Sequence, residues 1–444
     1  MLSKKELLAR AEKPAADAMR THPFYRGKIQ IAPKVPVHNV QDFAMWYTPG
    51  VAAPCKDIAA NPAMSWEHTN RANTIAVVSD GTRVLGLGDI GPLAAMPVME
   101  GKALIFKYLG GVDAVPICLD TRDADELIRT VKLLQPSFGG INLEDIAKPK
   151  CFRILDTLRA EMDIPVWHDD QQGTAAVTLA GLLNALKVVG KKLDNVAIAL
   201  VGAGAANVAI ARLILAAGAD PARMMLVDTK GILHSERADF APNDPRRELA
   251  QKTNRVNRRG NIQKALFETD VCIALSRPGP DTLSAGWLKA MAADAILFAC
   301  ANPIPEIWPW EAKEAGVRIV ATGRSDFANQ VNNSLGFPGI FRGVLDIRAR
   351  TITDEMAIAA AHEIALCAEE KGLSEDYIIP TMDEWDVFPR VAAATAVKAQ
   401  EQGVALLTKS RKELYQEAKA TIQQSREMLE NLMSDGFIAP MPQE

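Results

Sequence analysis

A glycine-rich turn near the middle of the chain carries the clearest chemical signal in the sequence. The letters VGAGAAN, from Val201 to Asn207, spell GxGxxN, and the β-rich stretch Val196–Val201 leads into them. An apolar, helix-like stretch follows. Small residues in such a turn let the backbone approach a pyrophosphate, whose charge meets the positive N-terminal end of the helix. The pattern predicts a dinucleotide site at Gly202–Gly204; a turn that is tight only for packing is the alternative.

An acidic residue follows at the place where such sites usually hold the cofactor's ribose. The apolar run MMLVD ends in Asp228. A carboxylate there accepts hydrogen bonds from the ribose hydroxyls and repels a 2′-phosphate. The residue therefore favours NAD⁺ over NADP⁺, although Lys230 and Arg237 stand close enough in sequence to offset its charge.

Two acidic pairs end two other strand-like runs, Glu144–Asp145 and Asp169–Asp170. The carboxyl ends of parallel strands line one crevice, so these side chains are expected to converge there. Converging carboxylates repel one another unless a cation neutralises them. Oxygen ligands without clustered His or Cys favour Mg²⁺ or Mn²⁺ over zinc. The alternative is that each pair caps a following helix, and spacing alone does not decide between the two.

A second glycine motif matches GxGxxG letter for letter at Gly86, Gly88 and Gly91. It follows a strand-like run and leads into Pro92, so no helix N-terminus is expected to open there. Such an isolated match is weak evidence for a dinucleotide site. We expect a tight turn that lines a pocket.

The elements that must position these residues alternate between strand-like and helix-like segments, which predicts an α/β fold with mostly parallel sheets. Residues 1 to about 40 indicate one helix and then an extended segment that contains Pro33 and Pro36. Residues 72–90 hold two strand-like runs divided at Asp80–Gly81, which predicts a hairpin. An apolar helix from Thr174 is expected to link two domains.

Three divisions of the chain are expected. The first is an N-terminal α/β domain at 1–168, and the second is a doubly wound, Rossmann-type dinucleotide domain at 169–390. A helical C-terminal extension is expected at 391–444, because the chain reads as helix beyond Thr353. Its polar stretch 409–433 is interpreted as a surface or subunit-packing helix.

Composition excludes several classes of protein. The 444 residues suit more than one domain, and a net charge of −4 gives no argument for nucleic acid or an anionic membrane. The N-terminus lacks the apolar core of a secretion signal, and polar residues interrupt the apolar stretch 196–219, which argues against a membrane span. Six scattered cysteines without a CxxC pair indicate reduced core residues in a cytoplasmic protein. They are Cys55, Cys118, Cys151, Cys272, Cys300 and Cys367.

Longer motifs resemble those of the malic enzymes, specifically the short bacterial type. The matching segments are WYTPGVAAPC from Trp46, VVSDGTRVLGLGDIGPLAAMPVMEGKALIFK from Val77, GGINLEDI, IPVWHDDQQGTAAVTLAGLLNAL, FACANPIPEI and TGRSDFANQVNNSLGFPGIFRG. Together they run from about residue 20 to about residue 390. The resemblance implies oxidative decarboxylation of L-malate to pyruvate and CO₂, with reduction of NAD⁺ or NADP⁺ and with Mg²⁺ or Mn²⁺. It also implies that the domain at 1–168 is the substrate and metal domain.

The resemblance also implies roles for individual residues. Tyr47 is similar to the family's general acid and Lys102 to its general base. Arg83 corresponds to a clamp on a substrate carboxylate, and Asp169 to a residue behind the metal ligands. The implied metal ligands are Glu144, Asp145 and Asp170; the substrate contacts are Arg83, Lys102, Asn302 and Asn333; the cofactor contacts are Gly202, Ala203, Gly204, Ala205, Ala206, Asp228, Asn302 and Asn332.

Two departures from the family pattern are visible. Gln172 stands where many relatives carry His, and the polar tail after about residue 400 is longer than expected. A malolactic enzyme, which releases lactate without net NADH, is the alternative function, and a catalytically inactive regulatory dinucleotide-binding protein is a third. We expect a homodimer or higher homo-oligomer, a small-molecule substrate, and neither nucleic acid nor membrane as partner.

Overall fold

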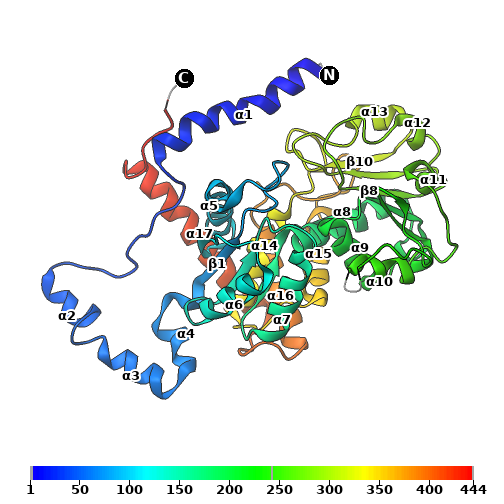
Figure 1. Cartoon of the computed structure of the whole chain (residues 1–444). Coiled ribbons are helices and arrows are strands. Elements are labelled where there is room, and N and C mark those ends of the chain that lie inside the picture. Colours follow the sequence, from blue (N-terminus) through cyan, green and yellow to red (C-terminus); the bar gives the residue numbers. More distant parts are fainter. Residues whose placement is uncertain (1–3, 242–243, 443–444) are drawn as a thin grey trace.

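The computed structural model describes residues 4–241 and 244–442 and contains one parallel and one mostly parallel sheet (Figure 1). The first has the order β2-β1-β3-β4, and all its strand pairs are parallel. The α/β prediction is confirmed. Its strands are β1 Thr74–Ser79, β2 Asp113–Cys118, β3 Gly140–Leu143 and β4 Val166–His168; its covering helices are α5 Gly91–Gly110, α6 Ala124–Leu134 and α7 Lys150–Glu161.

The second sheet has the order β10-β9-β8-β5-β6-β7, and only the β6–β7 pair is antiparallel. This is the doubly wound arrangement that the sequence predicts. The strands are β5 Ile198–Val201, β6 Met224–Asp228, β7 Gly231–Ile232, β8 Val271–Ala274, β9 Ile296–Ala299 and β10 Ile319–Thr322. The helices between them are α9 Ala205–Ala216, α10 Pro245–Lys252, α11 Ile262–Leu266, α12 Ala285–Leu288 and α13 Pro309–Glu314.

Helix α8 (Thr174–Val188) leads from β4 of the first sheet to β5 of the second, as expected. It is almost entirely buried because it packs against α9 and against α15 (Asp354–Glu369). The apolar residues on all its sides therefore contact protein, which explains why the sequence of this helix shows little amphipathic pattern.

The C-terminal helices return to the first sheet. They are α14 Phe337–Asp346, α16 Val387–Glu401 and α17 Arg411–Ser434. Helix α14 approaches α16 closely at Gly339, where an added Cβ would lie 2.7 Å from the carbonyl oxygen of Phe388. Helices α14 and α17 both contact α5. The polar stretch 409–433 is thus a surface helix packed on its own chain, and the division expected at 390/391 falls inside α16.

The two strand-like runs between residues 72 and 90 do not form the predicted hairpin. Both edges of β1 are occupied by parallel partners, β2 and β3, so no edge remains for an antiparallel run. The chain turns at Gly81, whose φ is 67°, and the amide of Gly91 donates to its carbonyl oxygen at 3.1 Å. Within the loop, Val84 and Gly88 form one isolated bridge.

Two smaller expectations are also wrong. Helix α5 does begin at Gly91, because Pro92 is tolerated in the first turn, where its missing N–H has no helical partner. All six cysteines are free, as expected, but Cys55 is exposed and Cys118 half-buried, so these two are not core residues. The other four are buried.

The N-terminal region begins with α1 (Lys4–Tyr25) and continues as an extended segment, as expected. Short helices follow: α2 Phe43–Trp46, α3 Ala52–Ala60 and α4 Ser65–His68. The segment with α2 and α3 projects from the body of the molecule (Figure 1). Among the described residues, no helix is both long and apolar enough to cross a membrane.

Candidate active site

A cavity of about 910 Å³ opens between the two sheets. Residues after β3 and β4 line one end of it, and the turn after β5 together with the end of β6 lines the other. Because the carboxyl ends of parallel strands face the cavity from both sheets, it occupies the place where α/β folds bind ligands.

The glycine-rich turn at the second sheet has the shape that a pyrophosphate site requires. Gly202 has a φ of 96°, and an added Cβ would lie 2.6 Å from the carbonyl oxygen of Leu275. At Gly204 an added Cβ would meet no atom within 4 Å, so the backbone faces open space in the cavity. Helix α9 begins at Ala205, which directs free N–H groups toward that space.

Asn207 explains the departure from GxGxxG. Its buried side-chain amide donates to the carbonyl oxygens of Val201 and Gly202 at 2.9 and 2.7 Å. A glycine at this position could not make these bonds. The turn is therefore fixed by side-chain hydrogen bonds from the first turn of α9.

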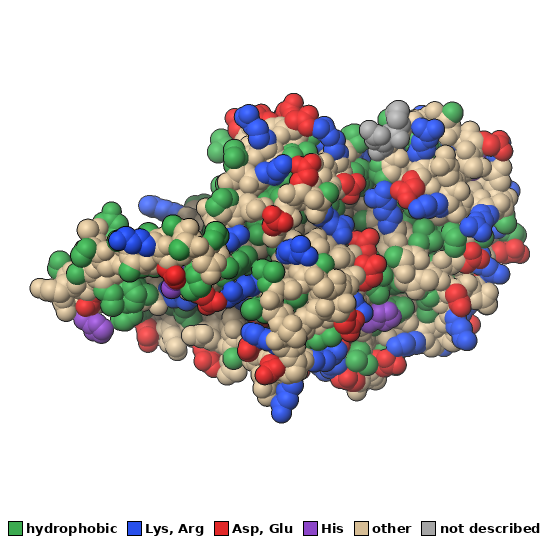
Figure 2. Space-filling view, turned by 90° about the horizontal axis from the view of Figure 1, so that it is seen from below, with side chains coloured by type: hydrophobic (Ala, Val, Ile, Leu, Met, Phe, Trp, Pro, Cys, Tyr) green, Lys and Arg blue, Asp and Glu red, His purple; other side chains and the backbone are tan. Residues whose placement is uncertain are grey.

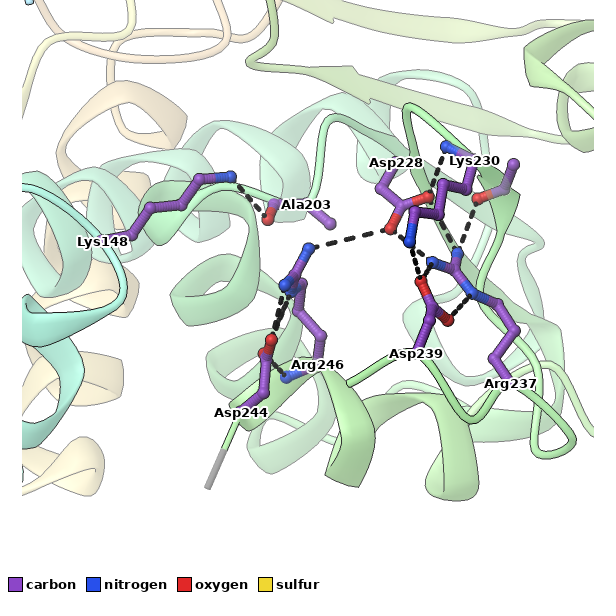
Figure 3. A network of polar contacts seen from close by, with 9 residues as sticks. Lys148, Ala203, Asp228, Lys230, Arg237, Asp239, Asp244 and Arg246 are labelled. Atoms are coloured by element: carbon purple, nitrogen blue, oxygen red, sulfur yellow. Dashed lines mark hydrogen bonds and ion pairs between the residues drawn. The ribbon is translucent and has the colours of Figure 1, made fainter. Parts of the chain in front are cut away.

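Asp228 lines the cavity within a network of alternating charges (Figure 3). Its two carboxylate oxygens accept hydrogen bonds from the two terminal nitrogens of Arg237, each at 2.8 Å. Arg246 lies 3.7 Å away and is itself paired with Asp244. Lys230 pairs with Asp239 through its ammonium. Arg237 thus offsets the charge of Asp228, which the sequence had left open. Arg246 and Lys230 are each paired with another aspartate.

At the first sheet, α5 places Lys102 against two carboxylates. Its Nζ lies 2.6 Å from Oδ2 of Asp169 and 3.0 Å from Oε1 of Glu144, and all three side chains are buried. The ring of Phe337 lies on another side, 4.2 Å from Nζ to its centroid. Burial by itself lowers the pKa of Lys102, but the charges of Asp169 and Glu144 outweigh it and raise the pKa above its ordinary value.

Without a bound cation, the ion pairs to Asp169 and Glu144 favour the ammonium form of Lys102. The structure also brings Asp169 into direct contact with Lys102, whereas the resemblance places it only behind the metal ligands.

The carboxylates of Glu144, Asp145 and Asp170 face the same end of the cavity. Burial, and then repulsion from Asp170, raises the pKa of Asp145 to about 7. Burial likewise raises the pKa of Glu144 well above its ordinary value, although Lys102 opposes the shift. Asp145 also has a φ of 56°, a conformation that is rare outside glycine and concentrated at functional sites.

These acids match a hard divalent cation in their chemistry. Oδ2 of Asp145 is buried and has no hydrogen-bond partner, and the donors are all carboxylate oxygens. Nevertheless, within residues 4–241 and 244–442 no three His, Cys, Asp or Glu side chains surround one point closely enough to hold a metal. Oδ2 of Asp170 instead accepts a hydrogen bond from the backbone N–H of Asp145 at 2.8 Å. The carboxylates that could bind a cation are therefore present, but their oxygens do not surround a single point.

The remaining predicted contacts lie on both sides of the cavity. Arg83, Asn302, Asn332 and Asn333 all line it, as do Ala203, Ala205 and Ala206 of the turn. The guanidinium of Arg83 donates to the carbonyl oxygen of Leu85. The side chain of Asn332 accepts from the backbone N–H of Ser334, so it caps a short helical turn.

Tyr47 is the one predicted catalytic residue that the fold does not bring to the cavity. It follows α2 in the projecting N-terminal segment, is 69% exposed, and does not line the cavity. A single chain therefore holds Lys102 and the acidic residues together but leaves Tyr47 apart from them.

Glu306 supports the cavity wall and was missed in the sequence. Its carboxylate accepts hydrogen bonds from the backbone N–H groups of Ser276 and Ala301, at 2.8 and 3.0 Å, and both of these residues line the cavity. It is fully buried, and burial raises its pKa to about 7. The sequence signal that could have identified this residue is an acid inside the apolar run that follows β9.

Similarity to known proteins extends along most of the chain. The family described as "Malic enzyme, N-terminal domain" matches residues 26–159, and "Malic enzyme, NAD binding domain" matches residues 171–402. A "Bifunctional malic/malolactic enzyme" of Bacillus subtilis is 49% identical over 88% of this chain and 94% of its own length. A "NAD-dependent malic enzyme" of Geobacillus stearothermophilus is 52% identical over 85% and 78%.

Solved structures agree with these relatives. The malic enzyme of Entamoeba histolytica superimposes with a TM-score of 0.95 and 47% identity, covering 100% of this chain and 93% of that one. The malic enzyme of Pyrococcus horikoshii gives a TM-score of 0.88 and 52% identity, over 92% and 94%. The turn, the acidic end and Lys102 thus lie within a fold and sequence shared with these proteins, and the chain belongs to the malic enzyme family.

Proposed function

We propose that the cavity between the two sheets carries out the oxidative decarboxylation of L-malate to pyruvate and CO₂, with transfer of hydride to NAD⁺ or NADP⁺. The observation that carries this proposal is the continuity of the cavity. One space joins the glycine-rich turn at Gly202–Gly204 to the buried cluster of Lys102 and Glu144. A dinucleotide on the turn would extend its nicotinamide toward that cluster.

Substrate binding is assigned to polar side chains at the end of the cavity that holds Lys102 and Glu144. Arg83 would pair its guanidinium with a malate carboxylate, and Asn302 and Asn333 would donate or accept at the remaining oxygens. Asn302 and Asn332 would also face the nicotinamide half of the cofactor. Malate carries two carboxylates, so a cationic clamp fits its charge.

Lys102 is proposed to take the proton from the C2 hydroxyl while hydride leaves C2 for the nicotinamide. The oxaloacetate so formed loses CO₂, and the enol of pyruvate receives a proton at C3. Tyr47 is proposed to donate that proton. Lys102 must first release its own proton, and Asp169, whose Oδ2 lies 2.6 Å from Nζ, is the group positioned to accept that proton.

Mg²⁺ or Mn²⁺ is proposed to bind through Glu144, Asp145 and Asp170. When bound, such a cation acidifies the substrate hydroxyl and stabilises negative charge on the C2 oxygen. The proposal is supported by the unpartnered buried Oδ2 of Asp145 and by the mutual repulsion that raises its pKa.

NAD⁺ is proposed as the preferred cofactor. Three aspartates and three basic residues alternate around the ribose end, and each of these three cations, Lys230, Arg237 and Arg246, is already paired with an aspartate (Figure 3). The roles of the two domains are proposed as the sequence predicts: residues 1–168 bind substrate and metal, and residues 169–390 bind the dinucleotide.

A cytoplasmic setting is proposed because all six cysteines are free.

The malolactic reaction is the second candidate, and the observation that favours it is the 49% identity to an enzyme named as bifunctional. The same cavity would serve it if NADH stayed bound and reduced pyruvate to lactate. Incubation with L-malate, Mn²⁺ and either NAD⁺ or NADP⁺ separates the two. Pyruvate and NADH in equal amounts support the malic reaction; lactate without net NADH supports the other.

Variants test the two proton-transfer roles separately. Lys102→Ala should show no burst of bound NADH in a rapid mix, because hydride transfer requires the hydroxyl proton to leave. Tyr47→Phe should keep a burst that slows when malate carries deuterium at C2, while steady turnover falls by roughly 10²–10⁴-fold. The reverse pattern would exchange the roles, and a loss below about threefold in both would remove them.

A further inference from the structure

A second cavity, of about 1250 Å³, lies between α7 of the first sheet and α10 of the second. A view of the molecule from below shows a notch between two lobes of the body, with Lys and Arg side chains beside Asp and Glu along it (Figure 2). The second cavity shares Lys148, Ala203 and Arg246 with the first, but neither Gly202 nor Asp228 lines it. It is therefore a neighbour of the proposed cofactor site and not a part of it.

Basic side chains outnumber acidic ones in the wall of the second cavity. The basic residues that line it are Lys148, Lys150, Arg153, Arg212, Arg246 and Arg247, and the acidic ones are Asp156, Asp239, Asp244 and Glu248. Charges of one sign along a cleft focus their field inside it and raise the local concentration of oppositely charged ligands. The wall thus favours an anion.

The acids of this wall are largely neutralised already. Asp244 pairs with Arg246 at 2.5 Å. Asp239 pairs with Lys230 and Arg237, and neither of these two cations lines the second cavity. Their negative charge is therefore compensated before any ligand binds, and repulsion of an incoming anion is reduced.

Two cations of the wall, Lys148 and Arg247, differ from the other four, each of which is paired with a carboxylate. Within residues 4–241 and 244–442 neither forms an ion pair, and the ammonium of Lys148 donates to the carbonyl oxygen of Ala203 at 3.5 Å (Figure 3). Lys148 precedes α7 and Arg247 lies on α10, so they come from opposite sides of the cleft. A ligand with two anionic groups can pair with both, and the planar guanidinium matches phosphate or carboxylate oxygens.

We infer that the second cavity binds a small polyanion, with phosphate or carboxylate groups, and that the bound anion weakens the binding of the cofactor. The second half of this inference rests on the proposed cofactor site at Gly202–Gly204. Lys148 and Arg246 line both cavities, so an anion in the second cavity draws positive charge away from the first. Its own charge also repels the cofactor pyrophosphate across Ala203. Because such coupling is reciprocal, the cofactor weakens the anion by the same factor.

Isothermal titration calorimetry with inorganic diphosphate, in the absence of metal, tests the site without using activity. NAD⁺ at saturating concentration fills the glycine-rich turn, so diphosphate that still binds must bind elsewhere. We expect one diphosphate per chain, bound about fivefold or more weakly when NAD⁺ is present. Citrate, titrated separately, distinguishes a site for phosphates from a site for polycarboxylates. Binding of either anion supports the inference, and binding of neither overturns it.

Arg247→Gln tests where the anion binds. Arg247 lines only the second cavity, so the variant should bind the anion at least about tenfold more weakly, the worth of one charge-assisted hydrogen bond. Its affinity for NAD⁺ should not fall, which also shows that the variant is folded. Arg255→Gln is the matched control, because Arg255 is exposed and lines neither cavity. An anion that binds Arg247→Gln with undiminished affinity, or that NAD⁺ displaces completely, occupies the cofactor turn and contradicts the second site.

Lys148→Met tests the link between the two cavities. Loss of the shared charge should reduce the factor by which diphosphate and NAD⁺ weaken each other, as measured by titration of each in the presence of the other. A factor equal to that of the unmodified protein would refute the link through Lys148. A protein that binds diphosphate but not NAD⁺ would instead contradict the proposed cofactor site and leave the anion site supported.

Discussion

The Nζ of Lys102 lies 2.6 Å from Oδ2 of Asp169, and the other oxygen of that carboxylate accepts a hydrogen bond from the indole N–H of Trp167 at 3.0 Å. The Trp167 bond therefore fixes the orientation in which Asp169 meets Lys102. Gly173 completes the arrangement, because any Cβ there would collide with Oδ1 of Asp169.

Asp169→Asn should lower kcat by roughly 10–100-fold, the usual cost of losing a residue that orients a functional group. The amide would present N–H donors to Lys102 and displace its ammonium. NAD⁺ affinity should not change, since the turn at Gly202 lies at the other end of the cavity. Steady-state kinetics and cofactor titration test this. Trp167→Phe keeps the ion pair but removes the hydrogen bond that orients Asp169, so its loss of kcat should be smaller; a loss equal to that of Asp169→Asn would argue that the ion pair itself does not position Lys102.

Asp170→Ala should abolish the dependence of turnover on Mn²⁺ and lower kcat by at least roughly 10²-fold. Binding of NAD⁺ should remain. Titration with Mn²⁺, followed by electron paramagnetic resonance, measures the metal directly. Asp120→Ala removes an exposed carboxylate outside the cavity and should behave as the unmodified protein does. Full activity in the presence of excess chelator would contradict the metal proposal.

Gly202 and Gly204 should respond differently to substitution by alanine. Gly202→Ala forces a side chain onto a residue with φ of 96° and against the carbonyl oxygen of Leu275, so it should lower the free energy of unfolding by about 1–3 kcal/mol. Gly204→Ala meets no neighbouring atom, so its stability should be unchanged, but the new methyl group narrows the space for a pyrophosphate. Denaturant unfolding and NAD⁺ titration distinguish the two; equal effects in both assays would contradict the assignment of the turn.

Asp228→Asn should raise the ratio of kcat/KM for NADP⁺ over NAD⁺ by about tenfold or more, the worth of one charge-assisted hydrogen bond. The change leaves Arg237 with one aspartate partner instead of two and frees positive charge for a 2′-phosphate. Glu236→Gln is the matched control. It removes an exposed carboxylate that pairs with Arg259 outside the network of Asp228, so its cofactor preference should stay with NAD⁺.

Glu306 should give the protein a stability that falls as pH rises. Its pKa is raised to about 7 in the folded chain, so the folded state binds a proton more tightly than the unfolded state does. The stability is fully present below the ordinary glutamate pKa and is lost as pH rises to about 7. Glu306→Gln does not titrate, so its stability relative to the unmodified protein should improve by up to about 3 kcal/mol between pH 4.5 and 8. A difference that stays constant over this range would contradict the raised pKa.

Features set by neighbouring residues in sequence were predictable. The turn at Gly202–Gly204 depends on a strand, two small residues and a helix that follow one another directly, and the structure places all three as expected. The acids at Glu144 and Asp170 end their strand-like runs, and parallel pairing brings strand ends together whatever the details of packing.

Features set by long-range pairing were not predictable. The run after Gly81 has the composition of a strand, but β2 and β3 occupy both edges of β1 and leave it unpaired. The direct contact of Asp169 with Lys102 joins positions 67 residues apart, which no local pattern reveals. Tyr47 lies on the projecting N-terminal segment because the residues around it make no buried contacts, and a local motif does not encode that.

Helix α17 has a consequence for the order in which the protein is made. The hydroxyl of Ser425 donates to the carbonyl oxygen of Lys107 at 2.9 Å, and Ile422 is buried beside Leu109, so α17 covers the back of the helix that carries Lys102. A nascent chain that has left the ribosome as far as Glu401 contains both sheets and lacks this cover. The helix that holds the proposed base is translated well before α17, yet its packing is completed only when α17 emerges.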